Sequence, residues 1–175
     1  IQREQDLLDV MRGQVVQKQI MDDTKDNDDN KNENTILEQL GLEFDECNDK
    51  DIAVIKDALG SCADRFYKAW KVKNVKTQER FEKFVKENNI KNTKLLFHGS
   101  RNENWWSIIN TGLVLKPTNA VITGKMFGYG IYYAPKARKS LGYTSLDGSY
   151  WVRGNSKSGF MALMDVAYGK PYDVY

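Results

Sequence analysis

The chain has 175 residues, of which 41% are hydrophobic and 11% aromatic, and this composition is typical of one main folded domain rather than of a disordered protein. Its 26 basic and 24 acidic side chains leave a formal net charge of +2, so no overall field favours nucleic acid or an anionic membrane surface. No apolar run approaches the roughly 18 residues that a membrane span requires. Two cysteines and one histidine cannot complete a zinc site, so we expect no metal.

The first residues predict a helix followed by a linker. Leu7, Leu8, Met11 and Val15 recur at helical spacing within residues 3–20. Residues 22–34 contain no apolar side chain, and such a segment buries too little surface to offset the entropy of ordering it. The acidic positions of this linker also resemble a calcium-binding loop. That alternative is disfavoured because Asn27 stands where such a loop needs glycine for its sharp turn.

The rest of the chain alternates helix and strand patterns. Asn48 and Asp49 can cap a helix, and Thr77 can cap another whose apolar face is Phe81, Phe84 and Val85. The expected strands are rich in β-branched or aromatic residues and lie at 66–72, 95–97, 129–134 and 160–167. The expected helices lie at about 48–59, 77–88, 104–111 (ending at Gly112) and 136–142. The sequence therefore predicts an α+β fold.

The only histidine, His98, follows an apolar strand in the run His98-Gly99-Ser100. A glycine here lets the backbone approach a ligand closely, and its N–H and C=O can pair with a planar amide. Taken alone, a histidine after an apolar run is more often a satisfied structural side chain than a ligand contact. The tripeptide therefore needs support from the residues that follow it.

About thirty residues later comes a glycine-spaced aromatic segment with Gly128, Gly130 and Tyr132. Small residues leave space for a ligand and an aromatic ring can cover one of its faces, although alternation means that Tyr132 or the adjacent Tyr133 faces the core. If 136–142 is helical, Ser140 and Tyr143 project from one face about 5 to 6 Å apart. A hydroxyl beside a ring suits a flat amide. Lys139 next to them could meet a carboxylate or phosphate, or simply be solvated.

In order and spacing, these motifs resemble the NAD-binding half of the catalytic domain of poly(ADP-ribose) polymerases and their diphtheria-toxin-like relatives. The resemblance covers residues 37–175 and is strongest over 95–143. It implies an ADP-ribosyltransferase fold with split mixed or antiparallel sheets and short flanking helices. The implied domains are 1–34, a helix and acidic linker that could be a remnant of a helical regulatory region, and 35–175, the catalytic domain.

The resemblance also implies a role for each matching residue. His98 contacts the adenosine-side ribose, the Gly99 backbone and the Ser140 hydroxyl hold the nicotinamide amide, and Tyr132 and Tyr143 flank its ring. Ser100 and Asn104 contact the adenosine side, and Lys139 lies near the catalytic carboxylate. The catalytic set is then His98, Tyr132 and Lys139. The remaining triad member in the family is a glutamate on a later strand, which we expect beyond Tyr175, so the fragment alone should be crippled in catalysis.

Two functions follow from these expectations. The first is an NAD-consuming ADP-ribosyltransferase that cleaves the nicotinamide–ribose bond and transfers ADP-ribose to a protein or other macromolecular acceptor. The alternative is a non-catalytic module that binds NAD or ADP-ribose through the same residues. One departure bears on affinity, because Val114 stands where some relatives have arginine. Lone thiols and the lack of a signal segment indicate a cytoplasmic location, or a nuclear one in a eukaryote.

Overall fold

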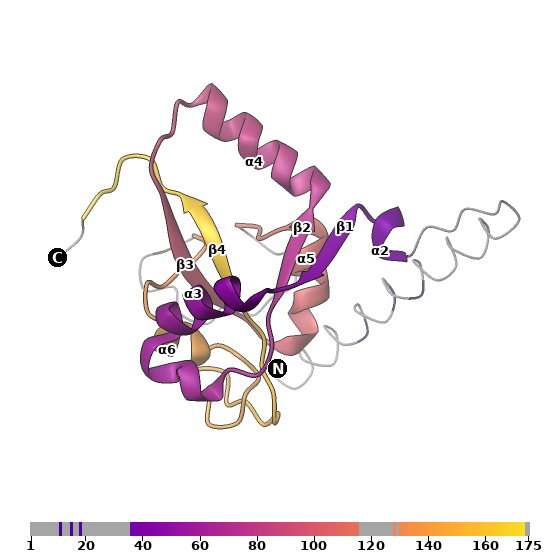
Figure 1. The fold of residues 1–175 in the computed structure, drawn as a ribbon, viewed down its shortest axis with the longest axis vertical. Coiled ribbons are helices and arrows are strands. Elements are labelled where there is room, and N and C mark those ends of the chain that lie inside the picture. Colours follow the sequence, from indigo (N-terminus) through magenta and orange to yellow (C-terminus); the bar gives the residue numbers. More distant parts are fainter. Residues whose placement is uncertain are drawn as a thin grey trace, which may run out of the picture.

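The computed structural model describes residues 36–115, 128 and 130–173, together with Met11, Val15 and Lys18 as single helical positions. Figure 1 shows two small sheets with short helices around them, and α4 runs from the first sheet to the second. In chain order the elements are α2 (Ile36–Gln39), β1 (Leu42–Glu46), α3 (Asp49–Leu59), η1 (Gly60–Arg65), β2 (Trp70–Asn74), α4 (Val75–Glu87), β3 (Thr93–Gly99), η2 (Asn102–Asn104), α5 (Trp105–Thr111), α6 (Ala137–Leu141) and β4 (Met161–Ala167).

Both sheets are antiparallel pairs. β1 pairs with β2, and β3 pairs with β4 in a register that sets His98 opposite Ala162. Phe97 also forms an isolated bridge with Ala134, in which each main-chain N–H donates to the other residue's carbonyl at 2.8 and 2.9 Å. The α+β prediction is confirmed by this arrangement. The finer expectation of an ADP-ribosyltransferase fold, and the division at residue 34, stay predictions.

Among the described residues, the hydrophobic core that positions the later elements is small. Its buried members are Cys62 of η1, Phe97 of β3 and Ala137 of α6, and Phe97 is only 3% exposed. Partly buried hydrophobic residues pack around them: Ala58, Leu59, Leu141, Met161 and Leu163. Because the three buried residues come from three elements, burial of their apolar surface holds α6 against β3 and η1.

The start of α3 follows the sequence prediction. Asn48 is the N-cap, and its side-chain oxygen accepts a hydrogen bond from the Asp51 N–H at 3.0 Å. The Asp51 carboxylate in turn accepts from the Asn48 N–H at 3.2 Å, which completes a capping box. Gly112 also ends α5 as predicted, with a positive φ of 83° that glycine adopts readily.

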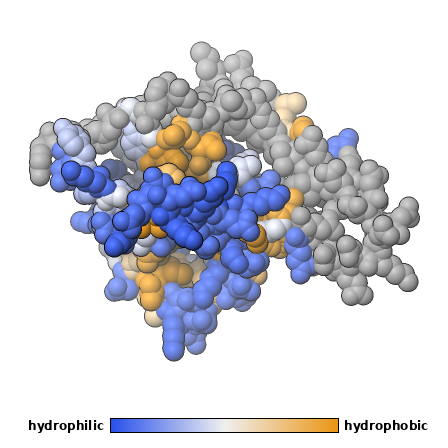
Figure 2. Space-filling view, turned by 90° about the horizontal axis from the view of Figure 1, so that it is seen from above, coloured by the Kyte–Doolittle hydropathy of each residue, from blue (hydrophilic) through white to orange (hydrophobic). Residues whose placement is uncertain are grey.

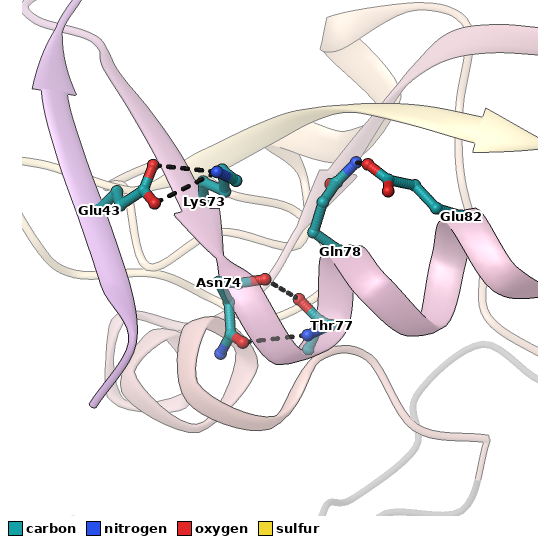
Figure 3. Close-up of polar contacts among 6 residues, drawn as sticks. All are labelled: Glu43, Lys73, Asn74, Thr77, Gln78 and Glu82. Carbon is teal, nitrogen blue, oxygen red and sulfur yellow. Dashed lines mark hydrogen bonds and ion pairs between the residues drawn. The ribbon is translucent and has the colours of Figure 1, made fainter. Parts of the chain in front are cut away.

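The predicted cap of α4 is wrong by three residues. Asn74 is the N-cap, and its side-chain oxygen accepts from the Thr77 N–H at 3.1 Å (Figure 3). The Thr77 hydroxyl donates to the Asn74 carbonyl at the same distance, so Thr77 lies inside the first turn. The Asn74 amide group is buried and also donates to the carbonyls of Ile109 and Asn110 at 3.0 and 2.8 Å. One side chain thus ties the start of α4 to α5.

Three other expectations need correction. The strand expected over 66–72 begins only at Trp70, and the Phe66 ring lies under the Lys56 ammonium, 5.3 Å from the ring centroid. Phe84 on the expected apolar helix face and Leu95 in the expected apolar strand are 56% and 51% exposed, so neither side chain belongs to the buried core. In Figure 2, which looks down on the molecule from above, the coloured residues at the centre of this face are mainly hydrophilic, and the hydrophobic ones form separate patches. Residues 130–134 form no strand beyond the single bridge at Ala134.

Several expectations concern residues outside the described part of the chain. They are the helix at 3–20 as a whole, the linker and calcium-loop alternative at 22–34, and the segment 116–127 with Tyr129. Across the described residues, none of the helices combines the length and apolar character that a bilayer crossing demands.

Candidate functional site

The end of β3 lies directly against α6 because Gly99 has no side chain. A Cβ at Gly99 would stand 1.9 Å from the Ser140 carbonyl oxygen and 2.8 Å from its carbon, so any other residue would collide with backbone. The Ser140 side chain is buried, and its hydroxyl donates to the Phe97 carbonyl at 3.0 Å. The structure therefore brings together Gly99 and Ser140, two residues that the sequence assigned to one site.

His98 is held in one orientation by its neighbours. Its Nδ1 lies 3.0 Å from the Tyr132 carbonyl oxygen, which can only accept, so Nδ1 carries the proton. The ring also meets the edges of Trp105 and Tyr133, with centroids at 6.3 and 5.9 Å. Burial lowers the pKa of His98 from its ordinary value of 6.5, partly opposed by the bond to Tyr132. A neutral imidazole of this tautomer presents Nε2 as a hydrogen-bond acceptor, which suits a sugar hydroxyl.

The two adjacent tyrosines have different partners. Tyr132 meets His98 through its main chain, while its own hydroxyl donates to the Gly128 carbonyl at 2.7 Å. Tyr133 instead contacts the imidazole through its ring, and burial raises the pKa of its phenol. Sequence reasoning assigned Tyr132 to the site and did not assign Tyr133. Alternation along an extended segment shows that one ring of such a pair points inward, but not which one.

Ser100 and Asn104 form a polar pair just beyond β3. The Asn104 side-chain amide donates to the Ser100 hydroxyl at 3.0 Å, and the Trp105 indole N–H donates to the Ser100 carbonyl at 3.2 Å. The neighbouring Arg101 and Glu103 form an ion pair at 2.6 Å. These bonds fix the first turn after β3. Ser100 and Asn104, both predicted for the site, therefore lie in an ordered turn directly after His98 and Gly99.

Tyr143 lies differently from the sequence expectation. The helix α6 ends at Leu141, so Tyr143 belongs to the following turn, where its N–H donates to the Ser140 carbonyl at 3.0 Å. Its ring stacks on Trp151, with centroids 6.0 Å apart and planes inclined by 18°. Ser140 is buried whereas Tyr143 is half-buried, so the two do not share one exposed helix face. Trp151 was missed because nothing in the sequence near it signals a return to α6.

Two further features complete the surroundings of the site. Lys139 is exposed on α6. A separate pocket of about 470 Å³ lies between η1, α6 and the turn at Gly148–Tyr150, and none of the eight predicted site residues lines it. We therefore centre the candidate site on the end of β3 rather than on this pocket. Within the described residues, no three His, Cys, Asp or Glu side chains gather closely enough to hold a metal ion.

Comparison with known proteins decides the family. The family model for the poly(ADP-ribose) polymerase catalytic domain matches residues 50–175. The chain belongs to this family. Among individual proteins, the chain is similar to poly [ADP-ribose] polymerase 2 of Zea mays. The two are 31% identical over 166 residues, which cover 89% of the chain. The resemblance stated from the motifs is therefore confirmed at the level of family.

Other relatives in the family match a shorter part of the chain. Oryza sativa subsp. japonica poly [ADP-ribose] polymerase 2-B is 40% identical over 101 residues, and Invertebrate iridescent virus 6 putative poly [ADP-ribose] polymerase-like 100L is 38% identical over 82 residues. These alignments cover 58% and 46% of the chain. The matched regions make up 24% of the Zea mays protein, 15% of the Oryza protein and 45% of the viral protein, so the chain spans a minority of each relative's length.

Proposed function

We propose that this chain holds NAD against the end of β3, and that the protein to which it belongs cleaves the nicotinamide–ribose bond and transfers ADP-ribose to a macromolecular acceptor. The observation that carries the proposal is the contact of Gly99 with Ser140. It unites the histidine-containing strand end with α6, in a chain that belongs to the polymerase family.

The reaction requires groups that hold the leaving nicotinamide, groups that hold the rest of NAD and a carboxylate that assists the acceptor. The residues described above can supply the first two. The bond between the ribose carbon and the pyridinium nitrogen breaks, its electron pair neutralises the departing nicotinamide, and an acceptor oxygen attacks the sugar carbon and loses its proton. The transition state resembles an oxocarbenium ion. The Gly99 backbone and Ser140 would hold the amide of the leaving nicotinamide, and Tyr132 and Tyr143 would flank its ring. His98, Ser100 and Asn104 would hold the adenosine side of NAD, His98 through the ribose. The third is a carboxylate that assists the acceptor. The resemblance gives this role to a glutamate, and the proposal assigns it to none of the residues described above.

Burial of His98 favours this role. Its lowered pKa keeps the imidazole neutral near pH 7, so it does not repel the positive nicotinamide ring and can accept a hydrogen bond at Nε2. Ser140 retains lone pairs that can accept from an amide N–H while its own proton bonds Phe97. Lys139, exposed on the same helix, is placed in this proposal near the acceptor-side carboxylate.

The test is titration calorimetry of the full chain with NAD. We expect His98→Ala and Tyr143→Ala each to weaken NAD binding by about three- to tenfold, the loss of one hydrogen bond or one ring contact. Tyr67→Ala is the matched control, because Tyr67 is 94% exposed. Unchanged affinity in both site variants would refute the site.

Turnover is measured by incubating the protein with labelled NAD. Release of nicotinamide and labelling of protein from labelled NAD supports the transferase, with both signals lost in His98→Ala. NAD binding without nicotinamide release would favour the non-catalytic binding module instead.

A further inference from the structure

Tyr143 is covered on one side by a residue that the sequence analysis did not assign. The Trp151 ring lies nearly parallel to it, with an interplanar angle of 18° and centroids 6.0 Å apart. Such an offset stack is one of the preferred geometries of aromatic pairs. Trp151 is nevertheless 55% exposed, so burial alone does not explain its position.

Trp151 is tied back to the end of α6 by its own backbone and by a glycine. Its N–H donates to the Gly142 carbonyl at 3.0 Å. Its Cδ1 lies 3.0 Å from the point that a Cβ at Gly142 would occupy, so a methyl group there would press on the indole. The position of the indole is therefore fixed by its contacts with Gly142 as well as by the stacking of the two rings.

The turn that precedes Trp151 is fixed in the same way. Ser149 is buried, and its hydroxyl donates to the Leu141 carbonyl at 3.0 Å. The Ser149 N–H donates to the Leu146 carbonyl at 3.0 Å, and Leu146 pairs with Ser156 in a parallel bridge. These bonds hold the segment 146–156 against α6 and place Trp151 beside Tyr143.

A phenol ring has two faces, and the stack occupies one of them. A flat ligand ring can then use the opposite face, and it meets a tyrosine whose orientation is already set. Fixing a contact ring before binding reduces the entropy that binding must remove. Resting on the proposed function, we propose that Trp151 is a positioning residue that backs Tyr143 and orients it toward the nicotinamide ring of NAD.

The test compares NAD with ADP, which lacks the nicotinamide ring, in calorimetric titrations of the full chain. We expect Trp151→Ala to weaken NAD binding about three- to tenfold and to leave ADP binding within about twofold. Trp151→Phe keeps a stacking ring and should restore most of the NAD affinity. Trp70→Ala is the matched control, since Trp70 is a half-exposed tryptophan on β2 in the other sheet.

A second measurement tests the stack without ligand. The near-ultraviolet circular dichroism of Tyr143→Ala and Trp151→Ala should change in shared bands, because both substitutions remove the Tyr143–Trp151 pair. Only Trp151→Ala also removes the edge contact with the Tyr150 ring, so the double variant should add little to the change seen in Trp151→Ala. Gly142→Ala should shift those bands too, since its methyl group would press on the indole. Additive spectral changes would overturn the stack.

The remaining outcomes separate this inference from the proposed function. If the wild-type chain binds no NAD, both fall together. If the wild type binds NAD and Trp151→Ala binds it equally well, or more tightly, the inference alone is overturned, and tighter binding would mean that Trp151 covers the ligand's face of Tyr143. Equal weakening of NAD and ADP would reduce Trp151 to a structural role and would also overturn it.

Discussion

At the scale of single residues, Gly99 has the strongest steric requirement in the described site. A Cβ there would overlap the Ser140 carbonyl at 1.9 Å, and backbone cannot rotate away as a side chain can. We predict that Gly99→Ala separates β3 from α6 and lowers the free energy of unfolding by about 1–3 kcal/mol or more. Urea denaturation measures the loss, and NAD binding should fall with it.

Gly130→Ala is the control for this substitution. Among the described residues, a Cβ at Gly130 would meet nothing nearer than the Tyr132 ring at 4.0 Å, so the change in unfolding free energy should stay within about 0.5 kcal/mol. If both alanine variants were equally stable, Gly99 would not be the point of contact between strand and helix.

His98 gives a pH dependence with a defined sign. Burial lowers its pKa in the folded state below the ordinary 6.5, so the unfolded chain binds the proton more readily. The stability contributed by the neutral imidazole is therefore fully present above about pH 6.5 and is lost as the pH falls through the folded-state pKa. We predict a decrease in unfolding free energy between pH 7.5 and about pH 5.5 that is smaller in His98→Gln.

The protein has one histidine, so nuclear magnetic resonance follows this group without assignment. The imidazole protons should titrate with a midpoint below 6.5 in the folded chain and near 6.5 in urea. A folded-state midpoint above 6.5 would contradict the burial of His98 and the neutral acceptor that the proposed function requires.

At the scale of elements, Asn74 joins two helices through one side chain. It caps α4 through Thr77 and donates to two carbonyls at the end of α5. Replacement by alanine removes a cap worth about 1 kcal/mol and leaves two part-buried carbonyls without their donor. We predict that Asn74→Ala costs about 2–3 kcal/mol of unfolding free energy, measured by urea denaturation.

Two variants separate the cap from the link to α5. Asn48→Ala removes an N-cap whose side chain, among the described residues, bonds only within the first turn of α3, and it should cost about 1 kcal/mol. Asn74→Asp keeps the capping oxygen but loses the amide donors, so it should recover less than half of the loss. A cost at Asn74 equal to that at Asn48 would show that the bonds to Ile109 and Asn110 contribute little.

These cases show which parts of the structure were predictable. Asn48 and Gly112 were identified from sequence because a cap depends on residues within one turn. Asn74 was missed because Thr77 is also a capping residue type, and the partners that favour Asn74 lie 35 and 36 positions away. The exposure of Leu95 depends on which elements cover β3, and the Trp151 stack depends on how residues 146–156 turn back. Neither is encoded in local periodicity.

At the scale of the whole molecule, the buried hydrophobic cluster lies in the same elements that carry the candidate site. The cluster of Cys62, Phe97 and Ala137 joins η1, β3 and α6, whereas the buried residues of the β1–β2 sheet are Leu42 and Asn74. Phe97 belongs to that cluster, bridges to Ala134 and accepts the Ser140 hydroxyl proton at its carbonyl. A change at this residue therefore affects the core and the site together.

We predict that Phe97→Ala lowers the unfolding free energy by about 3–5 kcal/mol, the usual cost of removing a buried aromatic side chain. Leu95→Ala, in the same strand but 51% exposed, should cost less than about 1 kcal/mol. Hydrogen exchange should accelerate first in β3, β4 and α6 and later in β1 and β2, because the lost contacts lie in the former group. Uniform acceleration across both sheets would instead mean that the molecule opens as one cooperative unit, with Phe97 supporting the β1–β2 sheet as strongly as the strand that carries His98.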